Sequence, residues 1–257
     1  MLTIISPAKK LNLDCSFNKD NISYPEFQQE TFDLVNILKS KSVQALKDLM
    51  HISDNLAELN FKRNQDFTNN FNLENSYPAA KLFNGEVYNG LDIDSFNDDD
   101  QAFAQNHLRI LSGLYGILRP LDLIQPYRLE MGSKLTNSKG PNLYKFWQDL
   151  ITEKINTELG SHKSPYLLNL ASNEYAKVID FKNLNKPVIS INFKDLINGN
   201  LKSIMMYAKA ARGAMANSII KNKIDTIELL KELVINDYRF SQEHSISDSE
   251  LIFTRTN

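Results

Sequence analysis

The spacing of apolar residues along the chain predicts a mixture of strands and helices. Residues 2–6, LTIIS, are an apolar run of strand length that stops before a proline. Between residues 24 and 61 the apolar positions recur at helical spacing and predict three helices, the second and third with Ser42 and Ser53 as N-caps. Residues 143–159 repeat the same period and predict a longer amphipathic helix.

Strands and helices continue to alternate toward the C-terminus. Two Asn-Gly steps in residues 81–92 predict tight turns, and Asn198-Gly199, flanked by two apolar runs, is typical of a type I′ hairpin. Strands are predicted over residues 166–172 and ELIFTR near the end, and helices over residues 174–179, 210–223 and 227–234. Without a linker or repeat, this order predicts a single mixed α/β domain over residues 1–257, with a largely buried sheet surrounded by helices.

The stretch HLRILSGLYGILRPLDLIQPYRLEMG, residues 107–132, places arginines among glycines and prolines. A helix that opens at Asp98 would end before Gly113, the turn would close at Gly116, and residues 117–124 would form a second short helix. This is the outline of a helix-hairpin-helix element, in which glycine amides contact a backbone phosphate. The alternative is an ordinary connection between helices, buried in the core.

The composition narrows the class of protein. The chain has 257 residues, 42% of them hydrophobic, and a formal net charge of −2, which does not by itself indicate a nucleic-acid-binding protein. The single cysteine, Cys15, excludes an internal disulfide and fits a reducing cytoplasm. We see no membrane-spanning segment and no signal peptide, so we expect a cytoplasmic protein without a membrane partner.

Charge is unevenly distributed along the chain. Basic residues outnumber acidic ones in residues 101–145 and 177–223, whereas the segment from Asp225 onward is acidic. If the two basic segments meet in the fold, they form a positive groove suited to a phosphate-rich partner. The alternative is that these lysines form a scattered, solvated face.

The SPAKK motif, Ser6 to Lys10, directly follows the first predicted strand. Binding residues are often found on loops that follow strands, so we expect Lys9 and Lys10 to contact phosphate. Ser6 and Lys9 also have the Ser-x-x-Lys spacing of some acyl-transfer enzymes, but they follow a strand instead of opening a helix, and the accompanying motifs are missing.

The motif YAKAARGAM, residues 207–215, places Lys209 and Arg212 at the predicted start of a helix. Since the helix dipole favours anions at that end, a bound anion would explain two cations there. The alternative is that they pair with a neighbouring carbonyl or carboxylate.

Metal and cofactor sites have little support in the sequence. The four histidines lack ligand spacing, and neither a Walker loop nor a strand followed by GxGxxG is present. We therefore expect neither a metal site nor a cofactor, and we expect Cys15 to be an inert thiol.

Five blocks, SPAKK, FNGEVYNGLD, LSGLYGILRPLDLIQPYRLEMG, NLASNEYAKVI and YAKAARGAM, resemble the peroxide stress protein YaaA family in order and spacing, over essentially the whole chain. The resemblance implies a cytoplasmic bacterial protein that limits free iron, and with it damage to DNA and protein, during hydrogen-peroxide stress. It also implies a single-domain α/β fold with a helix-hairpin-helix element and a positively charged cleft that binds DNA. It implies no established reaction.

The first hypothesis is therefore a DNA-binding stress-protection protein. DNA binding should be largely independent of sequence, since phosphate contacts carry no sequence information. The residues expected to contact DNA or phosphate are Ser6, Lys9, Lys10, Gly113, Gly116, Arg119, Tyr127, Arg128, Lys209 and Arg212.

Two other hypotheses remain open. An enzyme acting on a nucleotide or nucleic acid could use the same cleft, with Glu130 or Glu174 as candidate groups and its catalytic residues otherwise unknown. Direct iron sequestration has no ligand cluster to support it. The chain departs from the family pattern at Lys10, often Thr, and at Asn217 and Ser218, usually Arg and an aromatic residue, so binding should be weaker or use Lys221.

Overall fold

The strand β1 (Leu2–Ile5) lies in the middle of the main sheet in the computed structural model, which describes residues 1–18 and 21–256. All of its residues are buried, as a strand covered on both faces requires. It pairs in parallel with β5 (Leu108–Ser112) on one side and with β8 (Leu167–Asn169) on the other. The predicted first strand is therefore confirmed.

The sheet extends from this centre in both directions. Beyond β8 lie the parallel strands β9 (Val188–Ile197) and β13 (Glu250–Thr256). The antiparallel strands β12 (Tyr238–Phe240) and β11 (Val234–Ile235) complete that edge, and β6 (Gly116–Leu118) completes the other. β10 (Asn200–Lys202) folds back on β9 through Asn198 and Gly199, whose φ angles of 50° and 74° fit the predicted type I′ turn.

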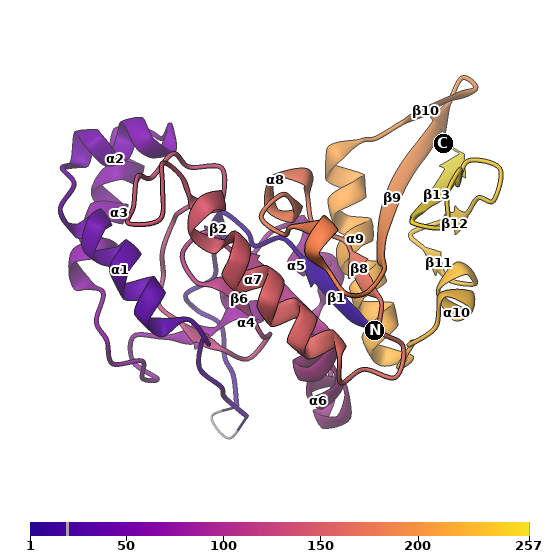
Figure 1. Cartoon of the computed structure of the whole chain (residues 1–257), viewed down its shortest axis with the longest axis horizontal. Coiled ribbons are helices and arrows are strands. Elements are labelled where there is room, and N and C mark those ends of the chain that lie inside the picture. Colours follow the sequence, from indigo (N-terminus) through magenta and orange to yellow (C-terminus); the bar gives the residue numbers. More distant parts are fainter. Residues whose placement is uncertain (19–20, 257) are drawn as a thin grey trace.

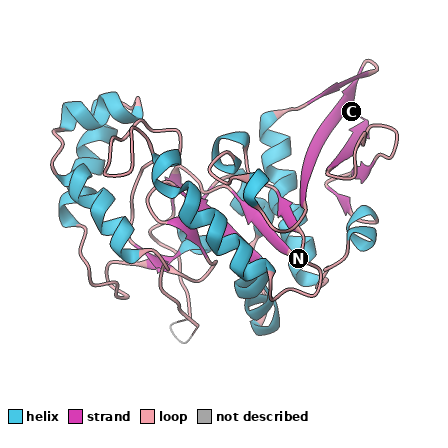
Figure 2. Ribbon diagram, viewed as in Figure 1, coloured by secondary structure: helices cyan, strands magenta, loops and turns pink. Residues whose placement is uncertain are grey.

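Helices surround this sheet. The helices α1 (Gln28–Lys39), α2 (Val43–Met50) and α3 (Asp54–Asp66) gather at one end of the molecule, and the last strands lie at the other (Figure 1). α7 (Leu143–Leu159) contacts β6, and α9 (Met205–Lys221) contacts β1 and β9. Figure 2 shows the strands between helices, which confirms the predicted mixed α/β fold with a buried sheet.

The remaining elements are short. Small antiparallel pairs form between β2 (Lys10–Leu11) and β4 (Phe83–Asn84), and between β3 (Tyr77–Pro78) and β7 (Leu123–Ile124). The short helices are α4 (Ala79–Leu82), α5 (Glu86–Leu91), η1 (Ile93–Ser95), α8 (Asn173–Ala176), η2 (Phe181–Asn183) and α10 (Ile227–Lys231). Buried apolar side chains from Met1 to Phe253 form one continuous core.

The glycine stretch forms a β-hairpin, so the placement of a helix-hairpin-helix element at these residues is wrong. α6 (Asp98–His107) begins where it was predicted but stops at His107, and the chain continues as the antiparallel strands β5 and β6. All residues of β5 are buried. A strand buried on both faces has a continuous apolar run, which periodicity cannot distinguish from a buried helix.

The turn between β5 and β6 is buried, which keeps its amides away from a phosphate. Ser112 Oγ accepts hydrogen bonds from the amides of Leu114 and Tyr115 at 3.2 and 3.0 Å. A Cβ on Gly113 would lie 2.3 Å from a backbone carbonyl oxygen, and one on Gly116, where φ is +72°, would lie 2.8 Å from the Trp147 ring. Both glycines are buried and serve close packing.

A close crossing of α5 and α9 positions one wall of the candidate site. A Cβ on Gly213 of α9 would lie 1.8 Å from the carbonyl oxygen of Val87 in α5, so the two backbones touch. Because α9 begins at Met205 and not at Ala210, Lys209 and Arg212 lie beyond its first turn, and the helix-dipole argument for them is wrong. The crossing instead places Arg212 beside the start of α5.

Candidate functional site

The largest group of predicted site residues surrounds a cavity at the carboxyl end of β1. The chain runs from β1 to β5 on one side and later returns to β8 on the other, so the strand order reverses at β1. In sheets with parallel strands, ligands bind in the crevice at such a switch point. The loops that follow β1 and β8 border a cavity of about 660 Å³ here, which we call the basic cavity.

Five separate segments of the chain line the basic cavity: the loop after β1, the start of α5, residues 127–130, the loop and helix after β8, and one face of α9. They bring together the predicted residues Ser6, Lys9, Lys10, Tyr127, Arg128, Lys209 and Arg212. Cations distant in sequence therefore share one site.

The other predicted residues lie elsewhere. Gly113 and Gly116 are buried in the β5–β6 turn. Arg119 pairs with Asp122 at 3.1 Å and donates to the carbonyl oxygen of Tyr24 at 3.0 Å, in a separate hollow that Arg109 also lines. The Arg119 guanidinium thus holds the chain around residues 119–122 to the loop before α1.

Glu130 balances part of the positive charge in the basic cavity. One of its oxygens lies 2.6 Å from Lys9 Nζ, and the other lies 3.1 Å from Arg128 Nη2. The side chains of Arg128 and Glu130 are only 16% and 21% exposed, whereas that of Lys9 is 61% exposed. Glu130 thus occupies the position of an anion between two cations.

Arg212 forms no ion pair with a carboxylate in the part of the chain that the structure describes. Its Nε is buried and, among the residues that the structure describes, has no hydrogen-bond partner, as is also true of Arg128 Nε. Burial alone lowers the pKa of the Arg212 guanidinium. A buried donor left unsatisfied costs about 1–3 kcal/mol, and more when it is charged. A ligand anion in the cavity would give the guanidinium a counter-charge.

Ser6 ties the two loops of the cavity together. Its hydroxyl accepts a hydrogen bond from the amide of Ser172 at 2.9 Å and lies 3.3 Å from Ser172 Oγ. Tyr88 donates to the carbonyl oxygen of Ser6 at 3.0 Å. Because Lys9 is engaged with Glu130, it does not activate the Ser6 hydroxyl, which instead joins the two loops.

Three tyrosines, Tyr88, Tyr127 and Tyr175, form the aromatic part of the cavity wall. Burial raises the pKa of each phenol, so all three are neutral at ordinary pH. The Tyr127 hydroxyl lies 2.6 Å from Ser112 Oγ. Sequence reasoning did not place Tyr88 in the site, although its motif FNGEVYNG was recognised, because the motif was interpreted only as turns.

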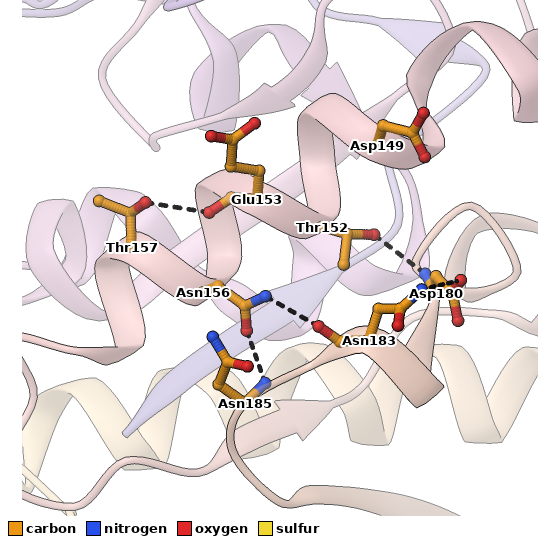
Figure 3. Close-up of a pocket in the computed structure, with 8 residues that line it drawn as sticks. All are labelled: Asp149, Thr152, Glu153, Asn156, Thr157, Asp180, Asn183 and Asn185. Carbon is orange, nitrogen blue, oxygen red and sulfur yellow. Dashed lines mark hydrogen bonds between the residues drawn. The ribbon is translucent and has the colours of Figure 1, made fainter.

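A second hollow, between α7 and η2, has a different chemistry (Figure 3). Asp149, Glu153 and Asp180 make it acidic, so it repels phosphate. Its polar side chains are used within the protein: Asn156 Nδ2 donates to the carbonyl oxygen of Asn183 at 2.9 Å, and its Oδ1 accepts from the amide of Asn185 at 2.7 Å (Figure 3). These bonds hold the loop before β9 against α7.

Within residues 1–18 and 21–256, no group of three or more histidine, cysteine, aspartate or glutamate side chains could hold a metal ion. In the same part of the chain no helix is both long and apolar enough to cross a membrane. Burial raises the pKa of the Cys15 thiol, which disfavours the reactive thiolate.

The fold and site define an α/β protein with a cation-lined cavity at the switch point of a largely parallel sheet. Residues 1–244 match the family described as peroxide stress protein YaaA, and the chain belongs to this family. It is 48% identical over 256 residues to a UPF0246 protein of Legionella pneumophila (strain Lens), covering 99% of both chains. It is 45% identical over 255 residues to one of Pseudoalteromonas translucida, covering 99% of this chain and 98% of the relative.

The blocks that carry the family resemblance converge on the basic cavity. SPAKK, NGEVY, YRLE, part of NLASNEY and the cations of YAKAARGAM all contribute lining residues. Asn217, where the family pattern usually has Arg, does not line the cavity. Its side-chain amide instead donates to the carbonyl oxygen of Leu91 at 2.8 Å. Lys221 is exposed at the far end of α9 and does not line the cavity either.

Proposed function

We propose that this protein binds DNA through the basic cavity and thereby contributes to protection against peroxide stress. The single observation that carries the proposal is Arg212, a largely buried guanidinium whose Nε has no partner in the described chain and which faces a cavity with other cations. Buried charges are normally paired. A phosphate oxygen is a matching partner, since the planar guanidinium donates in a fixed fork.

The arrangement of the other cations fits a nucleic-acid strand. Lys10 and Lys209 are exposed at the cavity, while Arg128 is mostly buried within it. Cations at the rim and in the interior allow successive phosphates to be contacted. The net charge of −2 makes binding depend on this local cluster and not on the protein's overall field. Contacts of this kind are independent of base sequence.

The link to peroxide follows from where such a protein would act. A protein bound along the phosphate backbone covers positions at which iron would otherwise associate with DNA and generate radicals close to it. The proposal therefore includes a cytoplasmic protein that reduces iron-dependent damage without binding iron itself. The Legionella and Pseudoalteromonas relatives carry names that specify no activity.

The test is fluorescence anisotropy of labelled duplex DNA titrated with the full-length protein over a salt series. We expect Arg212→Gln to weaken binding and to reduce the slope of log K against log salt by about one. Arg239→Gln is the matched control, because Arg239 is an exposed arginine on β12, away from the cavity. Equal binding by Arg212→Gln and the wild type would refute the basic cavity as the DNA-binding site.

A cellular test connects binding with protection. A strain lacking the gene is challenged with hydrogen peroxide after complementation with the wild type, Arg212→Gln or Arg239→Gln. We expect only Arg212→Gln to fail to restore survival at matched protein levels. Full rescue of survival by Arg212→Gln would show that protection against peroxide does not depend on the basic cavity.

A second candidate function is an enzyme that acts on a nucleotide phosphate or base in the same cavity. The observation that favours it is the presence of two carboxylates, Glu130 and Glu174, beside the neutral tyrosines. Glu174 Oε1 accepts a hydrogen bond from the Gly132 amide at 3.1 Å, which fixes its position. Chromatography of oligonucleotides and nucleotides after incubation tests this function: a new product that disappears in Glu174→Gln would support it.

A further inference from the structure

Met205 lies at the cavity with its side chain unusually exposed. It lines the basic cavity in the first turn of α9 and is 72% exposed. Its neighbour Met206 is 55% exposed but does not line the cavity. Large apolar side chains seldom stay so accessible without a binding role when they gather in one place. An apolar, flexible side chain therefore stands at the mouth of a cavity lined by cations.

The interior of the cavity offers flat apolar surfaces. Tyr88 and Tyr127 line it, and their hydroxyls are committed to Ser6 and Ser112. Both rings are largely buried against Phe83, so a ligand meets only the part of each ring that borders the cavity. Every nucleobase has a face that packs on such rings. The amides of Asn84 and Asn173, also in the wall, carry the donors and acceptors that a base edge needs.

We propose that the basic cavity receives one nucleotide extruded from a DNA strand and that Met205 fills the gap left in the base stack. This inference rests on the proposed DNA binding. A volume of about 660 Å³ is in the range of sites for single small molecules and far too small for a duplex. Proteins that take a base out of the stack hold it between aromatic and apolar side chains, and apolar wedges inserted at base steps are common among DNA-bending proteins.

The charges in the cavity favour a nucleotide within a strand over a free nucleotide. Three carboxylates, Glu86, Glu130 and Glu174, line the cavity together with the cations. A free triphosphate would bring several negative charges against them, whereas a nucleotide in a strand brings one phosphate charge. The exposed Lys10 and Lys209 then meet the phosphates on either side of the extruded nucleotide.

The test uses a duplex with 2-aminopurine at one position and fluorescein at a distant end, so that stacking and binding are read on the same DNA. Unstacked 2-aminopurine fluoresces more strongly. With the full-length protein at saturation we expect a severalfold rise in 2-aminopurine emission, larger when the base is mismatched, because less pairing is lost on extrusion. Met205→Ala should lose most of this rise, whereas the matched control Met206→Ala should keep it. Both positions are exposed, so both variants should fold.

The outcomes separate this inference from the function on which it depends. Saturable anisotropy without a rise in emission on either duplex overturns extrusion and leaves DNA binding intact. Equal emission for Met205→Ala and Met206→Ala overturns the role of Met205. The absence of any anisotropy change overturns both proposals. The last experiment is a competition with the free 5′-monophosphate of 2-aminopurine deoxyribonucleoside. If this nucleotide displaces the DNA when both are present at the same concentration of nucleotide, the cavity is a site for free nucleotides and the inference fails.

Discussion

Removing the carboxylate of Glu130 should strengthen DNA binding. Glu130 pairs with Lys9 and Arg128, and a phosphate must compete with it for both cations. Glu130→Gln keeps the shape of the side chain and removes its charge. The variant therefore tests whether the protein carries its own competitor for the ligand.

The magnitude follows from the two ion pairs. Partly exposed pairs contribute about 0.2–1 kcal/mol each, so releasing two of them favours the complex by roughly 0.4–2 kcal/mol, or about 2- to 30-fold in affinity. Two additional cations free to contact phosphate should also make the slope of log K against log salt steeper by as much as about 1.8. Both quantities come from one anisotropy salt series.

The control is Glu174→Gln. Glu174 lines the same cavity, but it accepts its hydrogen bond from the Gly132 amide and not from a cation. The variant should change affinity less than Glu130→Gln and leave the salt slope unchanged. Weaker binding by Glu130→Gln at an unchanged melting temperature, or an equal salt slope for both variants, would refute the competition between Glu130 and phosphate.

Three further predictions concern stability. Arg212→Met should raise the melting temperature of the free protein or leave it unchanged while weakening DNA binding, because it removes a largely buried charge that has no counter-ion among the described residues. Gly116→Ala should lower stability by at least about 1–3 kcal/mol in a denaturant titration, because φ is +72° and the Trp147 ring lies where the Cβ would go; a neutral result would contradict the described turn. Burial, followed by the charge of the Met1 amine, lowers the pKa of His162 from 6.5 to about 4. Between these pH values the unfolded chain binds more protons than the folded one, so the melting temperature should fall as the pH drops through this interval. His162→Gln should flatten this pH dependence of the melting temperature.

Much of the fold could be predicted from local patterns. The acidic start of α6 at Asp98 was recognised, and Asn97 caps it there. Ser42 caps α2 as predicted, by accepting a hydrogen bond from the Ala45 amide. Helical period, caps and Asn-Gly turns depend on neighbours in sequence, so they are visible without the fold.

The errors arise where distant residues decide the structure. The strand β5 was predicted as a helical end because its burial depends on β1 and β6. β11 and β12 were missed, since two- and three-residue strands exist only through their pairing. The exposure of Met205 at a cavity mouth depends on where α9 begins and what it crosses, which no window of sequence contains.

The central place of β1 has a consequence for synthesis of the protein. The segment Leu2–Ile5 is synthesised well before the two strands that pair with it, which contain Leu108 and Leu167. This apolar strand therefore has neither partner until β5 has been made, and lacks β8 for longer still, which exposes it to aggregation. C-terminal truncations that remove β8 should leave this strand open on one side and make the nascent protein depend on chaperones.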